Sequence, residues 1–134
     1  FTAAERRDAR SSLSGSGRRD PDQELASLAA RWAAKEALIK AWSESLWGSP
    51  PVAGEQIHHL IEVVRDAWGR PRLRFHGEVA EQLADVTSHV SLSHDGSFAT
   101  AMVTLSRCGR HRRLSSMTAS RCSWLSRTAK LSIE

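Results

Sequence analysis

The sequence lacks any long apolar run and contains only two cysteines. No stretch approaches the roughly 18 consecutive apolar residues of a membrane-spanning helix. A signal-type apolar segment is also missing, so the sequence predicts a cytoplasmic protein with no membrane contact. Cys108 and Cys122 have no CxxC or HxC pattern beside them, which argues against a zinc site or a disulfide framework. A chain of 134 residues without internal repeats fits one small globular domain.

The net charge of +4 is distributed unevenly along the chain. Residues 106–134 contain seven Arg or Lys residues and a single acidic residue, whereas residues 1–105 carry a net charge of −2. Residues 106–134 are rich in Ser and Arg and show no sustained hydrophobic period, so we expect a disordered basic tail after a domain formed by residues 1–105. A basic tail can bind nucleic acid, but such tails are more often simply solvated, and the acidic balance of residues 1–105 disfavours that function.

The hydrophobic pattern predicts an α+β fold, in which helices pack on a small antiparallel sheet. Thr2 and Glu5 have the spacing of a capping box at the start of a helix over residues 1–10. The strongest element is a helix over residues 24–46, which ends before Gly48 and two prolines. The other expected elements are strands at 59–66 and 72–76, a short helix at 77–86, and strands at 89–94 and 97–105 joined by Asp95-Gly96.

An acidic residue lies on the apolar side of the long helix. At about 100° per residue, Glu36 falls at the edge of the apolar stripe and Lys40 lies one turn further on. The stripe consists of Leu25, Leu28, Trp32, Ile39, Trp42 and Leu46, and beside it runs a strip of small residues, Ala29, Ala33 and Ala37. A carboxylate that faces a buried side is costly unless it is paired or bound to a metal ion. A solvated Glu36–Lys40 ion pair is the simpler alternative, but it does not explain an acid on the apolar side.

A second candidate segment is Ser91-Leu92-Ser93-His94-Asp95. Val90, Leu92 and His94 share one face of the predicted strand, so His94 continues an apolar face to the end of the strand. A single histidine in such a place is more often structural than functional. Neighbours on one strand cannot form a Ser-His-Asp triad, and the sequence has no GxSxG motif, so we exclude a serine hydrolase. The third candidate, Trp68-Gly69-Arg70-Pro71, is most simply a turn.

One longer block resembles a known family. The segment Arg31-Trp32-Ala33-Ala34-Lys35-Glu36-Ala37-Leu38-Ile39-Lys40-Ala41 is similar to the signature helix of the holo-[acyl-carrier-protein] synthases, the small 4′-phosphopantetheinyl transferases. Shorter blocks agree in order and spacing: Phe1-Thr2-Ala3-Ala4-Glu5, the Gly69-Arg70-Pro71 turn after an Ile-Glu-Val-Val strand, and Ser91-Leu92-Ser93-His94 before an alanine-rich strand. The helix block is the specific signal. The resemblance covers residues 1–105 and does not extend to residues 106–134.

This resemblance implies transfer of 4′-phosphopantetheine from coenzyme A to a serine of acyl carrier protein, in fatty acid biosynthesis. Glu36 matches the family's metal-ligand glutamate and Lys40 matches a lysine that contacts the phosphates, so both are expected to be catalytic. Mg²⁺ is the expected metal, acyl carrier protein the expected partner, and a homotrimer the expected assembly. Besides Lys40, the residues expected to contact coenzyme A are Arg31, Gly69, Arg70, Pro71, Ser93 and His94.

One part of the family pattern lies outside this sequence. The family begins with a Gly-Ile-Asp strand whose aspartate is a second metal ligand, upstream of the Phe-Thr-x-x-Glu block, whereas this chain begins at Phe1. We therefore expect an N-terminally incomplete member of the family, in which Glu36 alone holds Mg²⁺ weakly. The alternative function is a catalytically inactive fragment that binds carrier protein without turnover.

Overall fold

The computed structural model describes residues 1–11, 21–54, 56–107 and 123–132 of the chain. Cys108, Cys122 and the greater part of the predicted tail therefore lie outside the described residues. The elements are α1 (Ala3–Ser11), α2 (Pro21–Ser45), the 3-10 helix η1 (His58–Leu60), β1 (Ile61–Arg65), β2 (Pro71–Phe75), α3 (Gly77–Gln82), β3 (Val86–Asp95), β4 (Phe98–Arg107) and β5 (Ser123–Ser132). No helix of the described residues has the length and apolar composition needed to cross a membrane.

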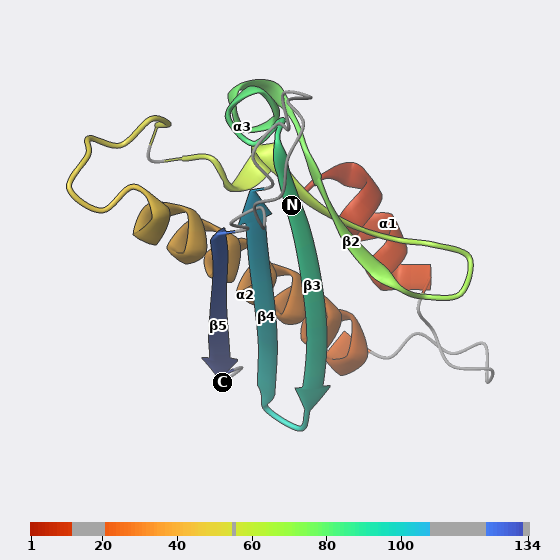
Figure 1. Cartoon of the computed structure of the whole chain (residues 1–134). Helices are drawn as coiled ribbons and strands as arrows, with labels where there is room; N and C mark the ends of the chain where they lie inside the picture. Colours follow the sequence, from red (N-terminus) through yellow and green to blue (C-terminus); the bar gives the residue numbers. More distant parts are fainter. Residues whose placement is uncertain (12–20, 55, 108–122, 133–134) are drawn as a thin grey trace, which may run out of the picture.

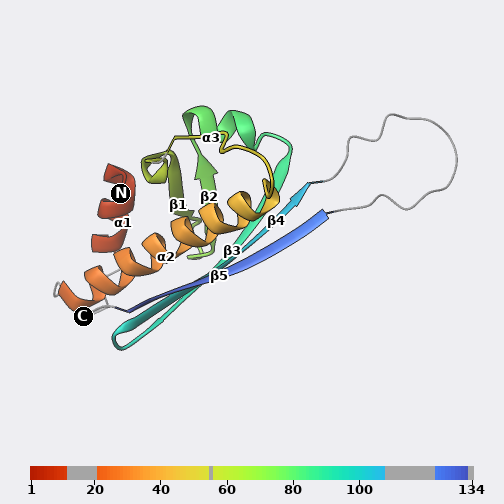
Figure 2. The same cartoon turned by 90° about the vertical axis from the view of Figure 1, so that its left-hand side faces the viewer.

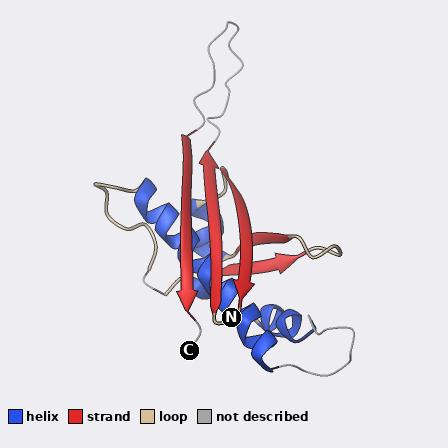
Figure 3. Cartoon of the chain, turned by 90° about the horizontal axis from the view of Figure 1, so that it is seen from below, coloured by secondary structure: helices blue, strands red, loops and turns tan. Residues whose placement is uncertain are grey.

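The strands form two antiparallel sheets, a β1-β2 hairpin and a three-stranded sheet of order β3-β4-β5. Helix α2 crosses one face of the three-stranded sheet, and α1 and α3 lie beside the hairpin (Figures 1 and 2). From below, the described helices all lie on the same side of that sheet (Figure 3). The predicted α+β fold, with a long helix on a small antiparallel sheet, is confirmed.

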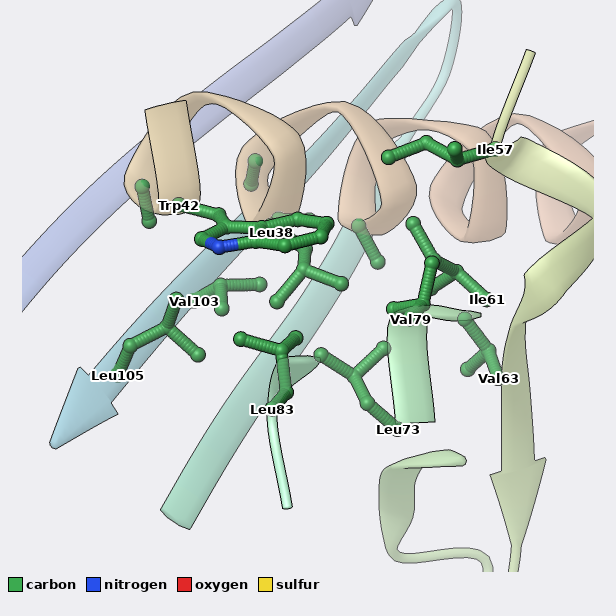
Figure 4. Close-up of a cluster of buried hydrophobic side chains, with 14 of the residues drawn as sticks. Leu38, Trp42, Ile57, Ile61, Val63, Leu73, Val79, Leu83, Val103 and Leu105 are labelled. Carbon is green, nitrogen blue, oxygen red and sulfur yellow. The ribbon is translucent and has the colours of Figure 1, made fainter. Parts of the chain in front are cut away.

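The core lies between α2, the three-stranded sheet and the hairpin (Figure 4). Its fully buried members include Leu38 of α2, Ile61 of β1, Val79 of α3 and Val103 of β4. Each comes from a different element, so this one cluster joins the layers. Burial of apolar side chains from separate elements is the main driving force that holds such a small domain together.

The buried side of α2 differs from the predicted stripe. Leu25 is 50% exposed, whereas the alanine strip is fully covered and extends along the helix. Its buried small residues are Ala26, Ala29, Ala30, Ala33, Ala34, Ala37 and Ala41. Small side chains allow strand β4 to approach the helix backbone closely, so contact with the sheet, rather than side-chain hydrophobicity, determines which face is buried. The alanine strip is thus part of the buried face, and the prediction that Leu25 lies on that face is wrong.

Strand β5 lies where the sequence led us to expect disorder. Ser123–Ser132 pairs antiparallel with β4 along its whole length, from Phe98 opposite Ser132 to Arg107 opposite Ser123. Without a neighbour, this edge of β4 would present unpaired N–H and C=O groups, and an extended segment can pair with them whatever its composition. The division of the chain at residue 105 stays a prediction.

The capping box at the start of α1 is confirmed. The Thr2 amide donates to Glu5 Oε2 at 2.8 Å, and the Glu5 amide donates to Thr2 Oγ1 at 3.1 Å. Glu5 is also buried and binds beyond its own helix: its carboxylate accepts hydrogen bonds from Lys35 Nζ at 2.9 Å and from the Val63 amide at 3.0 Å. Thr2 Oγ1 in turn donates to Glu62 at 2.7 Å. The cap of α1 thus attaches the helix to both α2 and β1.

Lys35→Met is expected to destabilise the fold strongly. Both side chains of the Lys35–Glu5 ion pair are completely buried, and removal of one partner of a buried pair costs about 3–5 kcal/mol. Urea denaturation measures the loss in the free energy of unfolding. Lys40→Met is the matched control, because it removes an exposed lysine of the same helix and should cost less than about 0.5 kcal/mol. If both substitutions lowered the free energy of unfolding by the same small amount, the structural role given to Lys35 would be contradicted.

A second charge cluster near α1 makes stability depend on pH. Arg65 binds Asp8 through Nε at 2.8 Å and Nη2 at 2.7 Å, and Arg31 pairs with the same carboxylate. The Arg65 hydrogen bond, aided by the charges of both arginines, lowers the pKa of Asp8 below its ordinary 3.8. A lowered folded-state pKa contributes stability above the unfolded pKa, and this contribution is lost as the pH falls through the folded pKa.

Asp8→Asn should therefore lower stability at neutral pH and flatten the loss of stability on acidification below about pH 4. Urea unfolding midpoints between roughly pH 2 and 7 measure this difference. Asp95→Asn, at an exposed position on the end of β3, serves as the control and should keep the wild-type profile. An unchanged acid profile in Asp8→Asn would show that another group is responsible.

Candidate functional site

Glu36 is half-buried on α2 and binds a histidine. Its Oε1 lies 2.7 Å from Nε2 of His58, the first residue of η1, and about a third of each side chain is exposed, 33% for Glu36 and 27% for His58. Within the described part of the chain, no ion pair joins Glu36 to Lys40. The structure thus explains the acid on the apolar side by a histidine partner, and not by the simpler Glu36–Lys40 pair.

The His58 ring is held against an aromatic side chain of α2. It stacks on Trp32 with ring centroids 4.5 Å apart and an angle of 4° between the planes. Trp32 in turn makes an edge contact with Phe1, at 6.1 Å between centroids. The His58 carbonyl accepts a hydrogen bond from Lys35 Nζ at 3.0 Å. His58 could not be predicted from the sequence, because a histidine before a strand gives no signal until tertiary structure brings it to the helix.

Lys40 is exposed one turn beyond Glu36. Residues four apart on a helix are surface neighbours, so the ammonium group of Lys40 and the carboxylate of Glu36 can reach the same bound ligand. A cavity of about 280 Å³ lies between the end of α2 and the segment that follows. The cavity is lined mainly by apolar side chains, among them Ile39 and Leu46, and reaches His58.

Gly69 and Arg70 lie in the turn of the β1-β2 hairpin, as predicted, whereas Pro71 is the first residue of β2 and pairs with Arg65. Gly69 has φ +82°, a left-handed conformation that favours glycine. Asp66 Oδ1 accepts the amides of Trp68 and Arg70, each at 2.9 Å. These bonds, led by the one from the Arg70 amide, lower the pKa of Asp66. The Arg70 side chain pairs with Asp66 through Nε and lies over the Trp68 ring, and it stays largely exposed at the tip of the hairpin.

Ser93 and His94 are exposed near the end of β3, and the structure does not bring them to Glu36. His94 is paired with Ala99 across the β3-β4 hairpin, and Ala99 packs against Ala29 and Ala30 of α2. These alanines precede Glu36 by two helical turns, about 10 Å along the helix axis. Within one chain, the predicted coenzyme A contacts on β3 therefore lie apart from the Glu36 site.

Arg31 has a different environment from the one its predicted role suggests. Its side chain is buried, binds Asp8, and donates to the Ser27 carbonyl at 3.0 Å. Arg31 Nε is buried with no hydrogen-bond partner among the described atoms. The guanidinium thus serves mainly to join α1 to α2. A contact between Arg31 and coenzyme A remains a prediction.

The metal-binding capacity of the site rests on Glu36. The described residues contain no group of three or more His, Cys, Asp or Glu side chains that could hold a metal ion. His58 occupies one oxygen of Glu36, and within the described part of the chain the other oxygen, Oε2, has no hydrogen bond. Mg²⁺ commonly binds through one or two carboxylates together with substrate phosphates and water. The donor set therefore fits Mg²⁺ only in company with a phosphate ligand.

Comparison with known proteins agrees with the block found in the sequence. A model of the 4′-phosphopantetheinyl transferase superfamily, ACPS, matches residues 1–103. Over 105 residues, the chain is 55% identical to the holo-[acyl-carrier-protein] synthases of Mycobacterium ulcerans (strain Agy99) and Mycobacterium tuberculosis (strain ATCC 25618 / H37Rv). The match covers 78% of this chain and 75% of each relative.

Solved structures give the same result for the fold. The acyl carrier protein synthase of Mycobacterium tuberculosis is similar with a TM-score of 0.62 and 52% sequence identity, over 78% of both chains. The Chronobacterium ammoniagenes ACPS-CoA complex is similar with a TM-score of 0.67 and 43% identity, over 80% of this chain and 77% of that chain. With a family match over residues 1–103 and more than half of the aligned residues identical to holo-[acyl-carrier-protein] synthases, the chain belongs to the 4′-phosphopantetheinyl transferase superfamily.

Proposed function

We propose that this protein transfers 4′-phosphopantetheine from coenzyme A to a serine of acyl carrier protein, in the fatty acid biosynthesis of the cytoplasm. The relatives that are 55% identical are holo-[acyl-carrier-protein] synthases, and a similar solved structure is a complex with CoA. The observation in the structure that carries the proposal is the half-exposed Glu36 carboxylate one turn before the exposed Lys40. This pair offers an anion for a metal ion and a cation for phosphate on one helix face.

The reaction is a phosphoryl transfer. The serine oxygen of the carrier protein bonds to the phosphorus that bears the pantetheine arm, the bond from that phosphorus to the bridging oxygen breaks, and adenosine 3′,5′-bisphosphate leaves. Glu36 receives the serine proton, directly or through a water molecule. Lys40 stabilises the negative charge that remains on the phosphates. Mg²⁺ held by Glu36 and phosphate oxygens would supply further charge neutralisation.

Coenzyme A contacts from Arg70, Ser93 and His94 are part of the proposal, together with a homotrimer. Because one chain keeps His94 away from Glu36, a neighbouring copy that presents its own β3 end would complete the site. Met102 of β4 is 47% exposed on the sheet face turned away from α2, where apolar surface is available for contact between copies.

A catalytically inactive protein that binds carrier protein is the second candidate function. It is favoured by one observation, that the described residues contain no group of three or more His, Cys, Asp or Glu side chains that could hold a metal ion. Transfer of labelled phosphopantetheine to carrier protein across a Mg²⁺ titration distinguishes the candidates, because only the transferase gives metal-dependent product.

Glu36→Gln should abolish Mg²⁺-dependent transfer and leave the fold intact. The amide keeps the size of the side chain but removes the negative charge that holds the metal ion and accepts the proton, so we expect a loss of at least about a hundredfold in kcat. Glu81→Gln, the same change at an exposed position on the surface, is the control. Near-normal transfer by folded Glu36→Gln would contradict the catalytic role.

Lys40→Met should weaken coenzyme A binding more than it slows the bound complex. A lysine that contacts phosphate as a point charge adds affinity, and its loss should raise KM for coenzyme A about tenfold, equivalent to roughly 1.4 kcal/mol. Steady-state kinetics with coenzyme A varied measure this change. Arg7→Met removes the same charge from the exposed side of α1 and should leave KM unchanged. An equal rise in both variants would mean that the overall charge, and not a local contact, attracts coenzyme A.

A further inference from the structure

We propose that His58 is a positioning residue, which fixes the Glu36 carboxylate in the orientation that the reaction requires. The inference rests on the proposed function of Glu36 and adds a residue that the sequence pattern did not indicate. Two observations support it: the 2.7 Å contact between His58 Nε2 and Glu36 Oε1, and the further contacts that restrain the ring and the carbonyl of His58.

His58 is restrained at its ring and at its main chain. The ring lies flat on Trp32, with 4.5 Å between centroids and 4° between planes. The carbonyl is bound by Lys35 Nζ at 3.0 Å, and Lys35 is itself completely buried against Glu5. An imidazole restrained at both points has little freedom to follow a moving partner, so the carboxylate must adapt to the histidine.

The chemistry of the two groups determines which atom carries the hydrogen in the contact between His58 and Glu36. An ionised carboxylate only accepts hydrogen bonds, so Nε2 of His58 carries the hydrogen and donates it to Glu36 Oε1. The donation is the same whether Nδ1 is protonated or not, so the arrangement does not depend on the charge of the ring. One oxygen of Glu36 is thereby occupied, and Oε2 is the oxygen left for a metal ion or a proton.

Fixing this oxygen matters because a glutamate side chain has several rotatable bonds. On a half-exposed helix surface, an unrestrained Glu36 would sample many rotamers, and only some would place Oε2 toward the phosphates bound by Lys40. Misplacement of a reacting group by about 1 Å can cost on the order of a hundredfold in rate. The histidine contact removes this freedom before substrate binds.

The test separates the hydrogen bond from the ring stack. His58→Phe keeps an aromatic ring for Trp32 but cannot donate to Glu36, whereas His58→Gln lacks the ring but can donate. His59→Phe is the matched control, because it places the same substitution on the exposed neighbouring histidine. Transfer kinetics give kcat and KM for coenzyme A. Mn²⁺ binding, measured by titration calorimetry with coenzyme A present and carrier protein absent, gives a readout independent of turnover, and thermal unfolding gives Tm.

We expect His58→Phe to lower kcat about tenfold and to weaken Mn²⁺ binding at least about threefold, with KM for coenzyme A within about twofold and Tm within about 2 °C of wild type. His58→Gln should recover a substantial part of both losses, and His59→Phe should behave as wild type. If His58→Phe does not fold, His58→Leu is measured by the same criteria.

Two results would overturn the inference. One is a folded His58→Phe whose kcat and Mn²⁺ affinity stay within about twofold of wild type. The other is equal loss in His58→Phe and His58→Gln that follows a fall in Tm, which would make His58 merely structural. The Glu36→Gln variant distinguishes failure of this inference from failure of the proposed function. If Glu36→Gln is active, the role proposed for Glu36 is wrong. If Glu36→Gln is inactive while His58→Phe is normal, only the role of His58 is wrong.

Discussion

The fold and the site both depend on the buried ion pair between Lys35 and Glu5. Lys35 Nζ binds the Glu5 carboxylate and the His58 carbonyl, and the same carboxylate accepts the Val63 amide. One charge pair therefore connects α1, α2, η1 and β1. A buried pair of this kind adds little net stability over apolar packing, because both charges lose their hydration. Its value is geometric, since these donors and acceptors are satisfied together when the four elements keep this arrangement.

The site is attached to this pair by the next residue of the helix. Lys35 and Glu36 are consecutive, so their side chains leave α2 in directions about 100° apart. The first points inward to Glu5 and holds the main chain of His58, while the second remains half-exposed and meets the ring of His58. Two adjacent residues thus hold one histidine at both ends. A shift of η1 relative to α2 would disturb the ion pair and the carboxylate together.

Features that depend on local sequence could be predicted, and those that depend on distant contacts could not. The capping box of Thr2 and Glu5 is a local hydrogen-bonding pattern, and the structure confirms it. Glu36 was found because helical period alone places it beside apolar residues. His58 lies 22 residues away along the chain and has no pattern of its own. The buried face of α2 was misplaced for a related reason, because the sheet that selects the alanine face is formed by residues far from the helix in sequence.

The division between buried and exposed charges explains how so small a domain can act on a highly charged substrate. In phosphoryl transfer the protein mainly positions the reacting groups and neutralises charge, because the substrates supply the leaving group and the nucleophile. Residues 1–105 carry a net charge of −2, so attraction for phosphates cannot come from the net charge of this part of the chain. It must come from exposed cations at particular places, such as Lys40 on α2 and Arg70 at the hairpin tip, which is exposed although it pairs with Asp66. The buried cations Lys35 and Arg31 serve the opposite purpose: their charges are satisfied within the fold, and they hold in place the helix that presents Glu36.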